Sequence, residues 1–186
     1  NNRGAKVVRT VSCSMLIDTE FAEHLAQFIM TPVGHTYVGN AVKTEGAVIG
    51  IEESGHIFLP QYAYYDDALF VPLKIIELAS QAGKSVHELA SEHPTYPFEE
   101  IVHKCPDNLK FSVVERVKEK VGKKYSNLST IDGVKVIFED GWALIRAANT
   151  SPKIRLYVEA KTKERFEEIK SEFSRMLTEE LALDAL

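Results

Sequence analysis

The sequence predicts two domains, an α/β domain over residues 1–93 followed by a small α+β domain over residues 97–186. Strand and helix patterns alternate in the first half, whereas three strand patterns follow one another between two helices in the second. Pro94 and Pro97 lie between the halves and mark the clearest linker. With 186 residues, of which 45% are hydrophobic, the chain can form a core in each domain.

The first domain is expected to begin with a strand at residues 6–10 (KVVRT). A helix with Asp18 as its N-cap should follow. The apolar residues expected along one face of this helix are Phe21, Leu25, Phe28 and Ile29. Two further strands are predicted at residues 35–38 and 47–51, and the second is continuously apolar, as in a strand covered on both faces.

Two helices complete the first domain. The longer helix is predicted to start at Asp66, with Asp66 and Asp67 as caps, and to end at Gly83. One face of this helix carries Leu69, Leu73, Ile76 and Ala79. A short helix at residues 86–91 then leads to the linker.

The second domain should open with a strand at residues 100–103 and a helix from Asp107 to Gly122. The apolar face of that helix consists of Leu109, Val113, Val117 and Val121. The remaining strands are predicted at residues 134–138, 144–146 and 154–158, with a hairpin turn at Asp140-Gly141. A last helix would bury Phe166, Ile169, Phe173, Met176 and Leu177. This pattern predicts helices on one face of an antiparallel sheet.

Composition excludes several classes of protein. The net charge of −5 and the lack of a basic stripe exclude nucleic acid as a partner, and no apolar run reaches the roughly 20 residues of a membrane span. Cys13 and Cys105 lack the spacing of a disulfide framework or a metal site, so we expect reduced thiols in a cytoplasmic protein. The opening NNRGAKVV, without an initiator methionine, is consistent with an excised piece of a longer protein.

The stretch EESGH, from Glu52 to His56, follows an apolar strand, where α/β sheets often bind ligands. On an extended segment Glu52 and Ser54 would project to the same side, so a carboxylate and a hydroxyl could contact neighbouring hydroxyls of a polyol. Gly55 would allow close approach of the backbone. The alternative interpretation is a solvated polar turn.

The stretch RAANTSP, from Arg146 to Pro152, connects two predicted strands. Arginine offers a planar fork that suits phosphate, while Asn149, Thr150 and Ser151 supply small side chains and closely spaced backbone N–H groups. The stretch could therefore hold a phosphate group. An ordinary polar hairpin remains the alternative.

The order of these motifs resembles the C-terminal half of the α-D-phosphohexomutases, most closely the phosphomannomutase/phosphoglucomutase branch. EESGH, the Asp66-Asp67-Ala68-Leu69 helix start, the linker, the DGV stretch at residues 132–134 and RAANTSP occur in the family's order over essentially the whole chain. The resemblance implies that the first domain is the family's third domain, truncated at its N-terminus. It likewise implies that the second is the fourth, an α+β domain similar to TATA-binding protein.

The resemblance also implies roles for residues of the first domain. Glu52 and Ser54 would contact sugar hydroxyls, and His56 ends the same motif. Gly34 and His35 resemble a turn whose histidine lies near the reacting phosphate, which makes His35 a candidate catalytic residue. Arg9 corresponds loosely to a basic residue near the family's active site. Ile51 stands where the family usually has glycine, which could alter the backbone path into this loop.

In the second domain the resemblance assigns Arg146, Ala148, Asn149 and Thr150 to the loop that grips the nontransferred phosphate. Ala148 replaces the family's usual serine, so one hydroxyl donor is missing and weaker phosphate binding is expected. Asn149, in place of the glycine usual in phosphoglucosamine mutases, favours the mannose/glucose branch.

The activity implied by the resemblance is the interconversion of mannose or glucose 1-phosphate and 6-phosphate. The family uses a phosphoserine, a hexose 1,6-bisphosphate intermediate and Mg²⁺. The 186 residues contain no Ser-His-Asn-Pro loop and no Asp-x-Asp-x-Asp metal loop, so we expect the chain alone to be inactive, to ligate no metal and to require N-terminal domains. Two alternatives stay open: a non-catalytic sugar-phosphate-binding module or pseudoenzyme, and a fragment of a phosphoglucosamine mutase.

Overall fold

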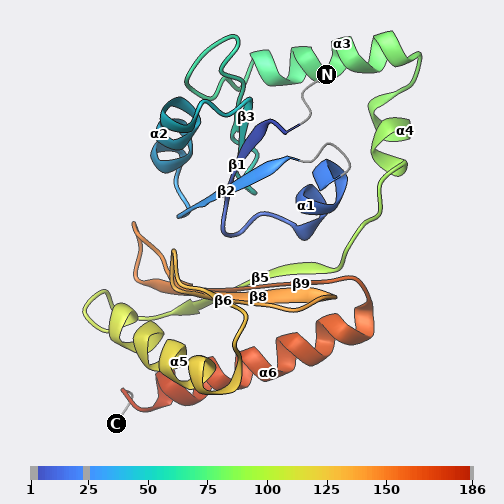
Figure 1. Ribbon diagram of the computed structural model, residues 1–186. Coiled ribbons are helices and arrows are strands. Elements are labelled where there is room, and N and C mark those ends of the chain that lie inside the picture. Colours follow the sequence, from blue (N-terminus) through green and yellow to red (C-terminus); the bar gives the residue numbers. More distant parts are fainter. Residues whose placement is uncertain (1–3, 23–25, 185–186) are drawn as a thin grey trace. The chain divides into compact units, whose positions relative to one another are not determined.

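The computed structural model in Figure 1 describes residues 4–22 and 26–184. The chain divides into two compact units, Asn1–Thr95 and Tyr96–Leu186, and each unit contains a sheet of its own. The first unit combines a largely parallel sheet with helices, and the second combines an antiparallel sheet with two helices. The predicted fold class, an α/β unit followed by an α+β unit, is confirmed.

The first sheet has the strand order β2-β1-β3-β4. Its strands are β1 (Lys6–Thr10), β2 (Gln27–Thr31), β3 (Ile49–Ile51) and β4 (Ile57–Phe58). β1 pairs in parallel with both β2 and β3, while β4 runs antiparallel to β3. The carboxyl ends of β1, β2 and β3 therefore lie at one edge of the sheet, where loops from three parts of the sequence can meet.

The helices of the first unit are α1 (Met15–Ala22), α2 (His35–Glu45), α3 (Phe70–Ala82) and α4 (Val86–Ser91). α2 packs on the sheet through Val38 and Val42, which join Val8 and Phe58 in a buried cluster. Gly50 permits this close packing, because a Cβ atom there would lie 2.5 Å from Val42 and 2.7 Å from Val38. α2 ends at Gly46 in the left-handed conformation.

The predicted helix from Asp18 through Ile29 is wrong in extent. Phe28 and Ile29 lie in β2, which pairs with β1 along its whole length, and this pairing overrides the helical spacing of their side chains. Asp18 is not an N-cap, because α1 begins at Met15 and Asp18 lies inside it. Leu25, assigned to the same helix, lies outside the described residues.

The predicted strand at residues 35–38 is also wrong. These residues form the first turn of α2, which begins after Gly34 turns the chain with φ 143°. Val38 and Val42, four residues apart, form the buried face of this helix. The four residues of the predicted strand are too few to show this helical spacing.

α3 begins at Phe70, four residues later than predicted. Oδ1 of Asp67 accepts the backbone N–H of Leu69 at 2.8 Å and of Phe70 at 2.9 Å, so the predicted capping by Asp67 is confirmed. The bond from Phe70, followed by that from Leu69, lowers the pKa of the Asp67 carboxyl. Asp66 does not cap α3 but pairs with His56. Gly83 ends the helix in the left-handed conformation, as predicted.

The second sheet has the order β5-β9-β8-β7-β6 and is antiparallel throughout. Its strands are β5 (Phe98–Lys104), β6 (Leu128–Ser129), β7 (Val134–Ile137), β8 (Gly141–Ala147) and β9 (Lys153–Ala160). The helices α5 (Lys110–Lys124) and α6 (Lys163–Ala182) lie on one face of it, as Figure 1 shows. The predicted hairpin at Asp140-Gly141 joins β7 to β8, while β6 was not predicted.

The core of the second unit lies between α5, α6 and the sheet. Its fully buried members include Val113, Val117, Ile145, Leu156, Phe173 and Leu177. The buried carboxylate of Glu180 joins the two helices, since Arg116 binds it at 2.8 Å and Lys120 at 2.5 Å. Lys120, and then Arg116, lower the pKa of this carboxyl. Within the described residues, no helix has the length and hydrophobicity needed to cross a bilayer.

Candidate functional site

Three loops with polar residues follow the carboxyl ends of β1, β2 and β3. Thr10 ends β1, and Ser12 and Cys13 follow it; all three are buried, and the Thr10 hydroxyl lies 3.1 Å from that of Ser12 and 3.3 Å from the Cys13 sulfur. The loop after β2 leads through Gly34 into α2, and β3 leads into Glu52. The backbone N–H of Gly34 donates to Oε1 of Glu52 at 2.9 Å, which joins the second loop to the third.

Residues Glu52 to His56 form a tight turn between β3 and β4. The N–H of Glu52 donates to the carbonyl of His56 at 2.9 Å, and Gly55, with φ 90°, donates to the carbonyl of Glu52 at 3.1 Å. The extended segment expected for Glu52 and Ser54 is therefore wrong, because Gly55 in the left-handed region closes a turn. Glu52 is buried, at 6% exposure, whereas Ser54 is exposed at the tip.

Ile51 is the last residue of β3 and leads directly into this turn. It pairs with Arg9 in β1 and with Ile57 in β4, so it continues the strand without a break. The carboxylate that follows is consequently presented at a fixed position at the edge of the sheet.

Two histidines lie close to this turn. Nδ1 of His56 is hydrogen-bonded to Oδ2 of Asp66, which an isolated bridge places beside Phe58 at the end of β4. The rings of His56 and His35 have centroids 6.1 Å apart, and His35 is the first residue of α2. With Nδ1 of His56 donating to this carboxylate, Nε2 is the ring nitrogen that faces other partners.

Arg9 lies in β1 and is 6% exposed. Its Nε and Nη2 both donate to the carboxylate of Asp18 at 2.7 Å, and its guanidinium lies 5.8 Å from the centre of the Phe28 ring. Nη1 of Arg9 and Oγ1 of Thr31, at the end of β2, are buried polar atoms without a hydrogen-bond partner among the described residues. The structure thus pairs the guanidinium of Arg9 with Asp18 of α1.

In the second unit, Arg146 is held by Asp132. Arg146 is buried in β8, and its Nε donates to Oδ2 of Asp132 at 2.8 Å. Gly133 makes this pairing possible, since its φ is 73° and a Cβ atom there would lie 2.1 Å from the carbonyl oxygen of Ile145 and 2.8 Å from Cα of Arg146. The Asp132-Gly133 pair therefore positions the arginine from the bend that leads into β7.

The loop from Ala148 to Pro152 connects β8 to β9. The N–H of Ala148 donates to the carbonyl of Lys153 at 2.9 Å and closes the loop, while Asn149 and Thr150 are exposed at its tip. Ala148, predicted as a phosphate-binding position, is buried at 3% exposure. The buried ammonium of Lys110 donates to the carbonyl oxygens of Ala148 at 2.6 Å and Ser151 at 3.1 Å.

Sequence reasoning missed three partners of the predicted residues. The sequence predicts Asp66 as a helix cap and Asp132 as part of a motif, and it assigns no role to Lys110. A signal for Lys110 was available, because it lies four and seven residues before Val114 and Val117 on the buried face of α5. Asp66 and Asp132 gave no comparable signal, because their partners lie 10 and 14 residues away on other segments.

Magnesium, which the family resemblance implies, finds no suitable ligand set in the part of the chain that the structure describes. No group of three or more His, Cys, Asp or Glu side chains there could hold a metal ion. The carboxylates of the candidate site already have partners, because Glu52 binds Gly34, Asp66 binds His56 and Asp132 binds Arg146. These residues therefore do not fit a magnesium ion.

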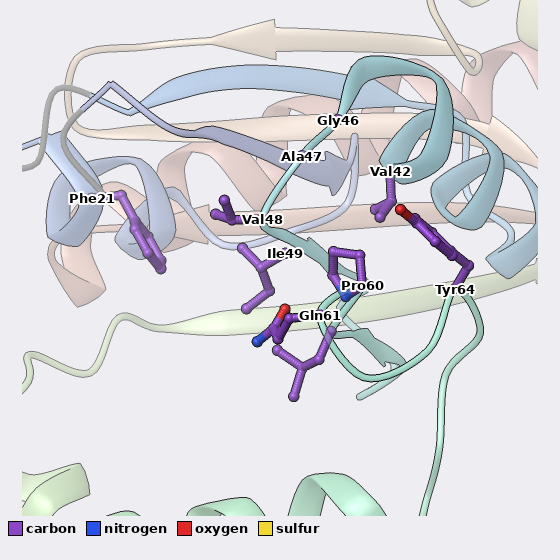
Figure 2. Close-up of a pocket in the computed structure, with 10 residues that line it drawn as sticks. Phe21, Val42, Gly46, Ala47, Val48, Ile49, Pro60, Gln61 and Tyr64 are labelled. Atoms are coloured by element: carbon purple, nitrogen blue, oxygen red, sulfur yellow. The ribbon is translucent and has the colours of Figure 1, made fainter. Parts of the chain in front are cut away.

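Figure 2 shows a pocket of about 650 Å³ in the first unit. Most of its lining is apolar, and Phe21, Ile49, Pro60 and Tyr64 contribute side chains to it. It lies at the amino end of β3, whereas the candidate site follows the carboxyl end. The described residues that line it are all different from the predicted site residues, so the pocket is separate from that site.

Comparison with known proteins gives consistent matches over both units. Residues 1–96 match the family described as phosphoglucomutase/phosphomannomutase, alpha/beta/alpha domain III, and residues 100–176 match its C-terminal domain. A protein named probable phosphoglucosamine mutase from Methanopyrus kandleri is 35% identical over 90% of this chain and 37% of its own length. A phosphoglucomutase/phosphomannomutase from Thermococcus kodakarensis is 34% identical over 90% of this chain and 36% of its own.

A solved structure gives the same result for the fold. A phosphoglucomutase/phosphomannomutase family protein from Burkholderia thailandensis superposes with a TM-score of 0.83 at 24% identity, covering 96% of this chain and 38% of that one. The chain thus spans a little over a third of the length of the relatives that it matches. The resemblance to the third and fourth domains is confirmed.

Proposed function

Because this chain belongs to the phosphoglucomutase/phosphomannomutase family, we propose that it is the substrate-binding C-terminal part of an enzyme that interconverts hexose 1-phosphates and 6-phosphates. The observation that carries the proposal is Arg146, fixed by Asp132 in the strand that leads directly into the exposed residues Asn149 and Thr150. This arrangement presents a cation and backbone N–H groups in one loop, a combination that suits a phosphate group.

The second unit binds the phosphate that is not transferred. Asp132 occupies Nε of Arg146, which leaves the two terminal nitrogens of the guanidinium to donate to two phosphate oxygens. Asn149 and Thr150 add hydrogen-bond donors from the tip of the loop. Ala148 lacks a side-chain donor, and its own N–H donates to the carbonyl of Lys153, so it shapes the loop without contacting the anion.

The first unit contacts the sugar. Oε1 of Glu52 is fixed by the N–H of Gly34, so Oε2 can accept hydrogen bonds from hydroxyls of the ring. Ser54 lies exposed at the tip of the same turn and can donate or accept. His35 would act near the transferred phosphate, and Arg9 would supply a second basic group in this unit.

His56 is proposed to take the proton from the sugar hydroxyl that attacks the phosphoryl group. Asp66 binds Nδ1 of His56, so Nε2, on the opposite side of the ring, is the atom that would accept the proton. Other carboxylate–histidine pairs act as general bases in the same way. The phosphoserine and the Mg²⁺ that neutralises phosphoryl charge belong, in this proposal, to N-terminal domains of the full-length protein. Cys13 and Cys105 are both buried, as expected of reduced thiols in a cytoplasmic protein.

The activity can be tested with the full-length protein and with the 186-residue chain in parallel. The full-length protein should convert mannose 1-phosphate and glucose 1-phosphate to the 6-phosphates, and the chain alone should not, because neither the phosphoserine loop nor the metal loop occurs in it. Turnover by the purified chain would refute this dependence. Binding of hexose phosphates by the full-length protein without turnover would favour the non-catalytic module.

Glu52 provides a test of sugar recognition. In the full-length enzyme Glu52→Ala should lower kcat/KM by about 10- to 100-fold, because a hydrogen bond to a charged group contributes about 1.5–3 kcal/mol. Glu53→Ala, at the adjacent exposed position, is the matched control and should retain wild-type kinetics. Equal effects of the two substitutions on kcat/KM would remove Glu52 from the sugar site.

Glucosamine phosphate is a second candidate substrate, favoured by the 35% identity to the Methanopyrus kandleri protein. The ratio of kcat/KM for glucosamine 1-phosphate to that for glucose 1-phosphate separates the two substrates. A ratio well above one would assign the enzyme to the phosphoglucosamine mutases.

A further inference from the structure

Lys110 is a buried lysine at the start of α5 that contacts the loop between β8 and β9. Its side chain is 4% exposed, and its ammonium lies 2.7 Å from Oδ1 of Asp107 in addition to the carbonyls of Ala148 and Ser151. An ammonium has three N–H donors, so these three acceptors satisfy it completely. The contact joins the start of α5 to residues 38 and 41 positions further along the chain.

This contact fixes the direction of the peptide group between Ala148 and Asn149. In a planar trans peptide the carbonyl and the following N–H point in opposite directions. Because the carbonyl of Ala148 points at Lys110, the N–H of Asn149 points away from it, toward the exposed side of the loop. This N–H has no hydrogen-bond partner within the described chain, so it is available to an external acceptor.

The rest of the loop is held on the same side. The N–H of Cys105 donates to the carbonyl of Pro152 at 3.0 Å, so the carbonyls of Ala148, Ser151 and Pro152 all have partners from the segment 105–110. Carbonyl oxygens would repel a phosphate group. Their pairing with Lys110 and Cys105 keeps three such oxygens away from the anion.

We infer that Lys110 is a positioning residue for the phosphate loop, acting through the Ala148–Asn149 peptide rather than by touching the phosphate. The inference rests on the proposed phosphate-binding role of this loop. The two cations would then have different roles. Arg146 contacts the phosphate, and Lys110 orients the backbone N–H group that donates to the same phosphate.

The test uses the 186-residue chain and titration with inorganic phosphate, followed by the amide NMR shifts of the loop. In the wild type the Asn149 amide should show the largest shift among the loop amides. Lys110→Met keeps the apolar stem but removes the donors, and it should weaken phosphate binding at least tenfold and abolish the preference for the Asn149 amide. Val114→Ala, a cavity substitution on the buried face of the same helix, is the control for lost stability and should retain the wild-type affinity and shift pattern.

Each outcome decides the inference. Affinity of Lys110→Met within twofold of the wild type would overturn it, and so would an equal loss in Val114→Ala, which would indicate general destabilisation. If Lys110→Met does not fold, Lys110→Gln keeps an amide donor in place and should give an intermediate loss; unchanged binding in that variant would also overturn the inference. Absence of phosphate binding in the wild type, unchanged by Arg146→Met, would instead refute the proposed function of the loop and the inference with it.

Discussion

Gly133→Ala is expected to destabilise the second unit by about 4 kcal/mol or more and to abolish phosphate binding. An alanine Cβ would lie 2.1 Å from the Ile145 carbonyl oxygen and 2.9 Å from Cβ of Arg146, and φ 73° is itself unfavourable for an L-residue by about 1–2 kcal/mol. The clashing atoms belong to the adjacent strand, so the hairpin must separate to relieve them. Urea denaturation followed by the fluorescence of Trp142, the single tryptophan, reports on this unit.

Gly122→Ala is the matched control for this substitution. Gly122 lies inside α5, and a Cβ atom there would meet no atom within 4 Å. Alanine is favoured over glycine in a helix by about 1 kcal/mol, so the control should be slightly more stable than the wild type. Equal unfolding midpoints of the two variants would show that Gly133 is not needed for the pairing of β7 with β8.

Arg146→Met in the full-length protein is expected to weaken binding of glucose 1,6-bisphosphate by about 100-fold or more. Two charge-assisted hydrogen bonds are lost, and each contributes about 1.5–3 kcal/mol. The substitution also leaves Asp132, whose side chain is 14% exposed, without its arginine, which should cost about 1–3 kcal/mol of stability. Calorimetric titration measures the affinity, and chemical denaturation measures the stability.

The double variant Arg146→Met, Asp132→Asn separates these two effects. A neutral amide at position 132 costs less free energy to bury without a cation than a carboxylate does, so the stability should recover. The affinity for the bisphosphate should stay low, because the guanidinium that binds the phosphate is still missing. Recovery of affinity together with stability would mean that Arg146 supports the fold and does not contact the ligand.

Sequence patterns predicted best the elements whose local signals and tertiary pairing agree. The strand at residues 6–10 and the hairpin at Asp140-Gly141 were found because strand propensity and turn chemistry suffice to define them. The predicted helix includes Phe28 and Ile29 of the strand Gln27–Thr31, because nothing in five residues reveals that β1 lies beside them. The first turn of α2 was missed for the related reason that helical spacing appears only when the window extends to Val42.

The candidate site shows the same limit. Glu52, His56 and Arg146 could be singled out because their residue types and order carry chemistry. Their partners Gly34, Asp66 and Asp132 are defined by which segments fold back on one another. The buried Lys110 differs from these partners, because a lysine on an apolar helical face already signals a buried contact before any coordinates exist.

The crowding around Gly133 also has an evolutionary consequence. A relative in which another residue replaces Gly133 would need a different pairing of β7 with β8. Only with that new pairing could an arginine at position 146 again be oriented toward the phosphate. Asp132, Gly133 and Arg146 should therefore be inherited or lost as one unit, while neighbouring tip positions such as Asn149 stay free to diversify among relatives with different sugars.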